Sequence, residues 1–145
     1  MNYDLIILGG GPGGCAAAVY AARKRLKTLL ITESFGGQSI VSETIYNWIG
    51  TPEIGGNDLA KDLESHVRAY EEPTGTLTIH TGERVASVEQ GENESWVVKT
   101  AQETFSTRTI LVTTGSSRKK LTIPGADTFE NRGVVYCASC DGPIF

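Results

Sequence analysis

The sequence predicts an α/β fold with a doubly wound parallel sheet, and three patterns support this prediction. Residues 5–8 and 28–31 are short, continuous apolar runs, which are typical of strands buried on both faces. Residues 12–25, between these runs, are rich in alanine and basic at their end, which predicts a helix. Residues 109–113 form a third apolar run that leads into Gly115. A β-α-β unit with a later returning strand is the expected core of such a sheet.

A second helix and several short strands are predicted in the middle of the chain. Residues 35–56 contain three glycine turns and no clear hydrophobic period, so we expect an ordered loop, with room for a short helical turn. Asn57 can cap a helix that runs to about residue 71, because apolar side chains recur there at spacings of three and four. A short strand is predicted next, followed by an antiparallel β-meander, at residues 77–80, 84–89, 95–100 and 103–106.

Two parts are predicted along the chain. Residues 1–117 are expected to form the first domain. Residues 118–145 are expected to form a connector and the start of a second domain, because residues 116–132 are polar and contain a Pro-Gly turn.

Composition excludes several classes of protein. The net charge is −4 with no long basic tract, so we expect no nucleic-acid partner. We expect no membrane span either, since no apolar run reaches the ~20 residues that one requires. Three cysteines in 145 residues do not suggest a disulfide framework, and a cytoplasmic protein is the default expectation.

The first strand is followed by a nucleotide-binding fingerprint. Gly9, Gly11 and Gly14 match G-x-G-x-x-G, between a predicted strand and a predicted helix. In this Rossmann-like arrangement the glycines permit a tight turn, a close approach to pyrophosphate, and helix–strand packing. Glu33 follows Gly14 by 19 residues, close to the position expected for a ribose-binding carboxylate. The pattern predicts FAD or NAD, without choosing between them, rather than a 2′-phosphorylated nucleotide.

The last segment contains a Cys-x-x-Cys pair, Cys137 and Cys140, followed by Asp141. A redox-active dithiol is one reading of this pair; half of a zinc site and two inert thiols are the others. As a redox pair, one thiolate would attack a substrate disulfide and the other would resolve the mixed disulfide. Asp141 would then transfer a proton to or from a thiol. The alternative is that its charge only interacts with the end of a helix.

The chain resembles the N-terminal part of low-molecular-weight thioredoxin reductases and of the homologous flavoprotein subunit of alkyl hydroperoxide reductases. Thr113 departs from this pattern, since the family usually has alanine there. The resemblance rests on several segments in one order: residues 9–14 (GGGPGG), 35–38 (FGGQ), 45–50 (IYNWIG), 113–118 (TTGSSR), 132–134 (RGV) and 137–142 (CASCDG).

The resemblance implies that the first fingerprint binds FAD. Glu33 would bind the adenosine ribose. Gly37 and Gln38 would line the path of the flavin, Asn47 would lie near the isoalloxazine, and Thr114 and Gly115 would close over the cofactor. The pyrophosphate would be held by Gly9, Gly11, Pro12 and Gly14.

The resemblance also implies a reaction, in which electrons pass from NADPH to FAD, to this disulfide, and to a protein disulfide. Cys140 would face the flavin, Cys137 would be the interchange thiol, and Asp141 the acid–base group. The implied partners are a thioredoxin-like or peroxiredoxin-system protein and, at full length, a second copy of the chain.

The resemblance covers about half the length of family members. A nicotinamide domain would follow the cysteines and the chain would then return to the FAD domain, so we expect the isolated chain to be incomplete and to turn over little NADPH. Two alternatives stay open: a non-catalytic FAD-binding or redox-sensing module, and a reductase that uses another electron donor.

Overall fold

The computed structural model describes residues 2–71, 75–117, 119–130 and 132–136. The chain divides into two compact units, residues 1–115 and 116–145, and each is described by itself. Neither in length nor in hydrophobicity does any helix among the described residues meet the requirements of a bilayer span.

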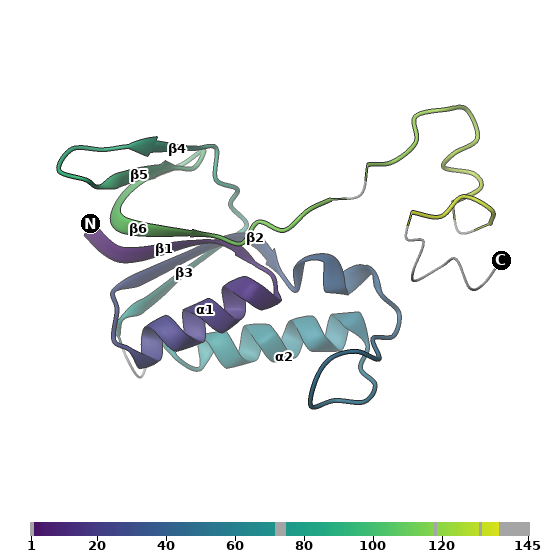
Figure 1. Ribbon diagram of the computed structural model, residues 1–145, viewed down its shortest axis with the longest axis horizontal. Helices are drawn as coiled ribbons and strands as arrows, with labels where there is room; N and C mark the ends of the chain where they lie inside the picture. Colours follow the sequence, from purple (N-terminus) through teal and green to yellow (C-terminus); the bar gives the residue numbers. More distant parts are fainter. Residues whose placement is uncertain (1, 72–74, 118, 131, 137–145) are drawn as a thin grey trace. The chain divides into compact units, whose positions relative to one another are not determined.

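The first unit is built on a six-stranded mixed sheet with the order β3-β2-β1-β6-β5-β4 (Figure 1). β1 (Asn2–Gly10) lies between β2 (Thr28–Phe35) and β6 (Thr104–Val112) and is parallel to both. β3 (Leu77–Thr81) extends the parallel part beside β2. β5 (Trp96–Lys99) and β4 (Ser87–Gln90) add an antiparallel edge on the other side. The predicted α/β sheet with a β-meander is therefore confirmed.

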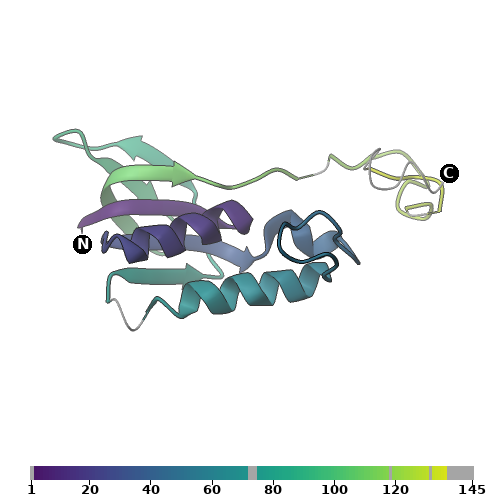
Figure 2. The same ribbon diagram turned by 60° about the horizontal axis from the view of Figure 1, so that its bottom comes forward.

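The two helices lie on the same face of this sheet, as Figure 1 and Figure 2 show. α1 (Pro12–Arg23) and α2 (Gly56–Arg68) cover β1, β2 and β3 through a buried cluster that includes Ile7, Leu30 and Val67. Because side chains alternate along a strand, the neighbouring residues of β1 and β2 point to the opposite face. There they pack with side chains of β5 and β6 in a second cluster: Tyr3, Ile6, Leu8, Leu29, Ile31, Val98 and Phe105.

The predicted cap of the second helix is wrong. α2 begins at Gly56, its N-cap is Gly55, and that cap makes no side-chain hydrogen bond. The Gly56 N–H instead donates to the carbonyl oxygen of Ser42 at 3.1 Å. The preceding loop contains the short helical turn that the sequence allowed, the 3-10 helix η1 (Gly37–Val41), and it brings Ser42 to the start of α2.

The last two strands predicted in this unit are one strand. β6 runs without interruption from Thr104 to Val112, pairing with β5 through its first residues and with β1 along most of its length. The prediction that residues 109–113 are buried is also wrong for the end of the strand, since Val112 is 65% exposed. In the described part of the sheet, residues 108–112 lie beside β1 on one side and beside no strand on the other, so that other side of β6 is open there.

The second unit consists of turns in its described residues. The Lys120 ammonium contacts the Glu130 carboxylate at 2.7 Å, and the backbone N–H of Leu121 donates to the Tyr136 hydroxyl at 3.0 Å. Glu130 and Val134 form an isolated parallel bridge.

Candidate functional site: the glycine turn between β1 and α1

The turn from β1 into α1 is too tight for side chains at two of the fingerprint glycines. Gly9 has φ +110°, and a Cβ there would lie 2.5 Å from the carbonyl oxygen of Thr113. A Cβ at Gly14 would overlap the Gly9 carbonyl oxygen and lie 2.8 Å from Thr113 Oγ1. The predicted roles in turn geometry and helix–strand packing therefore correspond to close backbone contacts.

Gly11 is different, because the space beside it is open. It is the N-cap of α1 with φ −73°, and a Cβ there would meet only the Gly37 Cα, at 3.9 Å. No side chain caps this helix, and Pro12 takes a first-turn position. The remaining first-turn N–H groups and the positive end of the helix dipole are the features that bind phosphate oxygens at helix N-termini.

A second glycine loop lies against this turn. The N–H of Gly36 donates to the Gly10 carbonyl oxygen at 2.9 Å, which joins the end of β2 to the end of β1. Gly37 follows with φ +55°, and a Cβ there would be 3.2 Å from the Gly11 Cα. Two stretches of bare backbone are thus brought side by side, and neither carries a side chain that would exclude a pyrophosphate.

Two threonines that were not predicted to be site residues hold these loops. The Thr32 hydroxyl is buried; it accepts the Gly10 N–H at 2.9 Å and donates to the Ser34 carbonyl oxygen at 2.7 Å. Thr113 Oγ1 lies 2.9 Å from the Leu8 carbonyl oxygen, which also accepts the Thr113 N–H at 2.9 Å. The departure from alanine at position 113 therefore adds a hydroxyl donor at the carboxyl end of β1.

Glu33 lies near the end of β2 and is exposed, as its predicted contact with a ribose requires. Its Oε2 accepts hydrogen bonds from Arg84 Nε at 2.9 Å and from Arg84 Nη2 at 2.7 Å. Arg84 was not predicted to be part of the site, because it lies 51 residues away in sequence. This ion pair holds the Glu33 carboxylate near the carboxyl end of β2, beside the carboxyl end of β1, where the glycine turn begins.

The other predicted site residues lie on separate segments. Gln38 is exposed on η1, and Asn47 is exposed on the loop closed by a bridge between Ile45 and Ile54. Thr114 and Gly115 follow β6 and are exposed, and the Thr114 Cα would lie 3.1 Å from a Cβ at Gly9. Cys137, Cys140 and Asp141 lie outside the described residues.

Cys15 follows the fingerprint and is buried in α1. Burial raises the pKa of its thiol to about 11, with a smaller contribution from the negative charge of Glu64. Its Sγ donates to the Gly10 carbonyl oxygen at 3.3 Å. The thiol is therefore protonated at neutral pH, as expected for a packing residue. Cys15 borders an apolar cavity of about 230 Å³ between α1 and α2, which Trp48 also lines and which reaches Pro12 at the start of α1.

Comparison with known proteins agrees with this geometry. The family described as "Pyridine nucleotide-disulphide oxidoreductase" matches residues 3–144. An alkyl hydroperoxide reductase subunit from Xanthomonas campestris pv. phaseoli is 38% identical over 144 residues, 99% of this chain and 26% of the relative. The corresponding protein from Escherichia coli K12 is 38% identical over 146 residues, 99% of this chain and 27% of the relative. The chain spans about a quarter of the length of these curated relatives.

Solved structures show the same fold. The thioredoxin reductase of Streptococcus pyogenes MGAS5005 matches with a TM-score of 0.82 and 31% identity, over 99% of this chain and 45% of that one. The thioredoxin reductase of Lactococcus lactis matches with a TM-score of 0.77 and 33% identity, over the same shares of the two chains.

Proposed function

Because the chain belongs to the pyridine nucleotide-disulphide oxidoreductase family, we propose that it is the flavin-binding part of a thiol–disulfide oxidoreductase of thioredoxin reductase type. The observation that carries this proposal is the bare backbone formed by Gly11, Gly37 and the uncapped start of α1. A dinucleotide pyrophosphate fits this surface, since its oxygens accept backbone N–H groups and its charge opposes the helix dipole.

FAD is the dinucleotide that we assign to this surface. Gly9, Gly11, Pro12 and Gly14 would hold its pyrophosphate, and Glu33 would accept hydrogen bonds from its adenosine ribose. Both bonds from Arg84 go to Oε2 of Glu33, so the ribose would be bound by Oε1. Gln38, Asn47, Thr114 and Gly115 would contact the flavin side of the cofactor.

The chemistry would take place at Cys137 and Cys140. When bound, FAD would supply the two-electron transfer between a nicotinamide cofactor, NADPH, and this disulfide. The Cys137 thiolate would attack a substrate disulfide, form a mixed disulfide and release one substrate thiolate. Cys140 would then attack Cys137, release the second substrate thiolate and close the ring. Asp141 would accept the proton that each cysteine thiol loses and pass it to the leaving substrate thiolate.

The substrate that we propose is the disulfide of a thioredoxin-like or peroxiredoxin-system protein. Relatives named as alkyl hydroperoxide reductase subunits and structures named as thioredoxin reductases support these two substrate classes equally well. We propose a cytoplasmic location and a homodimer for the whole protein.

The test compares FAD binding by two alanine variants whose substituted residues lie two positions apart in the sequence. Gly11→Ala places its methyl group in the open space beside Gly37, so the fold is kept while the approach of a pyrophosphate is blocked. Gly13→Ala places its methyl group 3.9 Å from Thr113 Cγ2 and is the control. Flavin fluorescence titration measures the dissociation constant, and circular dichroism verifies the fold.

We expect Gly11→Ala to weaken FAD binding by about tenfold or more, because charge-assisted hydrogen bonds are worth about 1.5–3 kcal/mol. Gly13→Ala should bind within about threefold of the parent chain. Equal binding by the parent chain and Gly11→Ala would contradict the assigned site.

A further inference from the structure

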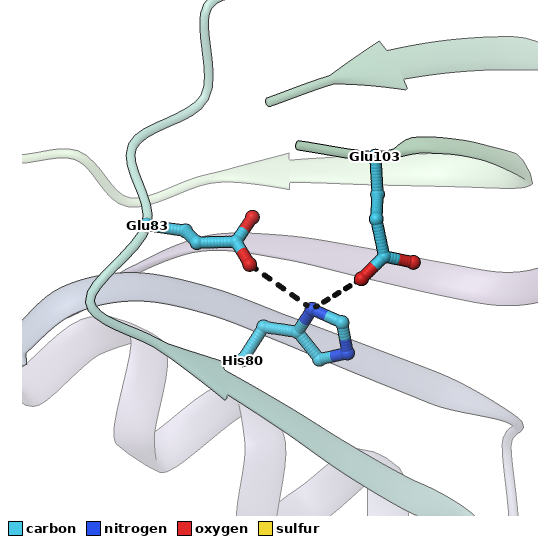
Figure 3. Close-up of side chains that lie close together, drawn as sticks. All are labelled: His80, Glu83 and Glu103. Carbon is cyan, nitrogen blue, oxygen red and sulfur yellow. Dashed lines mark ion pairs between the residues drawn. The ribbon is translucent and has the colours of Figure 1, made fainter. Parts of the chain in front are cut away.

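One side-chain cluster lies outside the glycine turn and plays no part in the proposed function. His80 on β3, Glu83 in the link that follows and Glu103 just before β6 converge in Figure 3. His80 Nδ1 lies 3.8 Å from Glu83 Oε1 and 3.9 Å from Glu103 Oε1. One ligand atom from each residue lies within 4.8 Å of the other two.

One oxygen of the Glu83 carboxylate, Oε2, lacks a hydrogen-bond donor among the described residues, although Oε1 faces His80. Its Oε2 has less than 1 Å² exposed and accepts no hydrogen bond from the described residues. Its side chain is 13% exposed. The adjacent cation in sequence, Arg84, donates to Glu33 instead. A buried carboxylate oxygen without a donor is costly, and a bound ion on this carboxylate would reduce that cost.

We propose that His80, Glu83 and Glu103 bind a divalent transition metal of the zinc type. An imidazole nitrogen with carboxylate oxygens is a donor set that Zn²⁺ accepts, whereas Mg²⁺ and Ca²⁺ prefer oxygen ligands alone. Three protein ligands leave a coordination position for water. The site is distinct from the dinucleotide surface, since none of its residues belongs to the glycine turn.

Only small movements are needed to close the cluster on a metal. Tetrahedral zinc with bonds of about 2.0–2.1 Å places its ligand atoms about 3.3 Å apart. The two distances from His80 Nδ1, 3.8 and 3.9 Å, would each shorten by roughly 0.5 Å. The two carboxylate oxygens lie within 4.8 Å of one another and would approach by at most about 1.5 Å. The His80 ring is held edge-on to Phe105 at 5.2 Å between centroids, which fixes its direction. Glu103 is 54% exposed and is free to adjust its rotamer.

The metal would act as a clamp between distant parts of the sheet. β3 and β6 are separated by β2 and β1 in the strand order. The three ligands span this distance above the sheet face opposite the helices, where Phe105 packs. Binding to the folded chain and not to the unfolded chain would raise the thermal midpoint.

The experiment measures zinc affinity in a background that removes a competing site. Cys-x-x-Cys thiolates bind zinc themselves, so Cys137 and Cys140 are both replaced by serine. The chelator-stripped chain is titrated with Zn²⁺ against a chromogenic chelator. His80→Gln and Glu103→Gln remove one ligand each. The matched controls are His66→Gln on α2 and Glu92→Gln in the β4–β5 turn, which lie outside the cluster.

We expect one Zn²⁺ per chain and a thermal midpoint that rises on zinc addition. Each ligand variant should lose about tenfold or more in affinity, since outer-shell changes alone cost about 10–100-fold. Glu103→Gln keeps the test decisive if His80→Gln unfolds, because Glu103 is an exposed side chain. Absence of zinc binding, or equal losses in the control variants, would overturn the proposal and leave the cluster as an ion-pair group only.

Discussion

The same substitution, glycine to alanine, should have opposite effects at two adjacent positions of α1. Gly13 is exposed in the first turn of the helix, and a Cβ there meets only Thr113 Cγ2 at 3.9 Å. Gly14 is buried, and a Cβ there would overlap the Gly9 carbonyl oxygen. The two variants therefore separate helix propensity from packing within one turn.

The expected magnitudes follow from these surroundings. Gly13→Ala should raise the free energy of unfolding by about 0.5–1 kcal/mol, which is the propensity difference between the two residues. Gly14→Ala should lower it by at least about 3 kcal/mol, the upper part of the usual range for overpacking, because the obstacle is backbone that cannot rotate away. That loss is large compared with the free energy of unfolding of a typical domain, which is about 5–15 kcal/mol.

Equilibrium unfolding in urea, followed by circular dichroism at 222 nm, measures both changes. Thr113→Ala supplies a further control. It removes the Oγ1 that would lie 2.8 Å from the new methyl group but leaves the Gly9 carbonyl in place. In the Thr113→Ala background, Gly14→Ala should therefore still destabilise the chain strongly. A Gly14→Ala variant as stable as the parent would refute the close packing of α1 against the end of β1.

Three further predictions concern single side chains. Because the pKa of Cys15 is raised to about 11 in the folded chain, its protonated thiol contributes to the free energy of unfolding below pH 9, and this contribution is lost as the pH rises towards about 11. Urea unfolding should show a loss of roughly 2–3 kcal/mol over this range in the parent chain and not in Cys15→Ala. Thr32→Val leaves the Gly10 N–H without its acceptor and should cost about 1–3 kcal/mol of unfolding free energy, whereas Thr32→Ser should recover most of it. Glu33→Gln should weaken FAD binding about tenfold in fluorescence titration, while its exposed pair with Arg84 changes the unfolding free energy by less than about 1 kcal/mol.

Local patterns predicted most of the secondary structure. The apolar runs at residues 5–8 and 28–31 became β1 and β2, and the alanine-rich segment became α1, because burial and helix propensity act over a few residues. The glycine fingerprint predicted the turn geometry for the same reason. The boundary between the meander and the returning strand was not predictable, since Thr107 and Arg108 look like a break until β1 pairs beside them.

The contacts that complete the site come from distant segments. Arg84 reaches Glu33 only because the link after β3 hydrogen-bonds to the end of β2, where the Glu83 N–H donates to the Thr32 carbonyl oxygen. His80 seemed an isolated histidine in the sequence, although Glu83 follows it by three residues. Its second neighbour, Glu103, is brought close by sheet pairing. No local periodicity carries such information.

The central position of β1 has a consequence for how the chain folds. Its partner on one side, β2, follows within the next 35 residues, but its partner on the other side is β6, with Asp4 and Thr109 joined across 105 residues of sequence. During synthesis on a ribosome, β1, α1 and β2 would emerge long before β6. One edge of β1 would therefore have no partner strand until β6 is synthesised. Contacts between such distant residues slow folding and expose open strand edges to other chains. We therefore expect the yield of native chain to respond to synthesis rate and to chaperones.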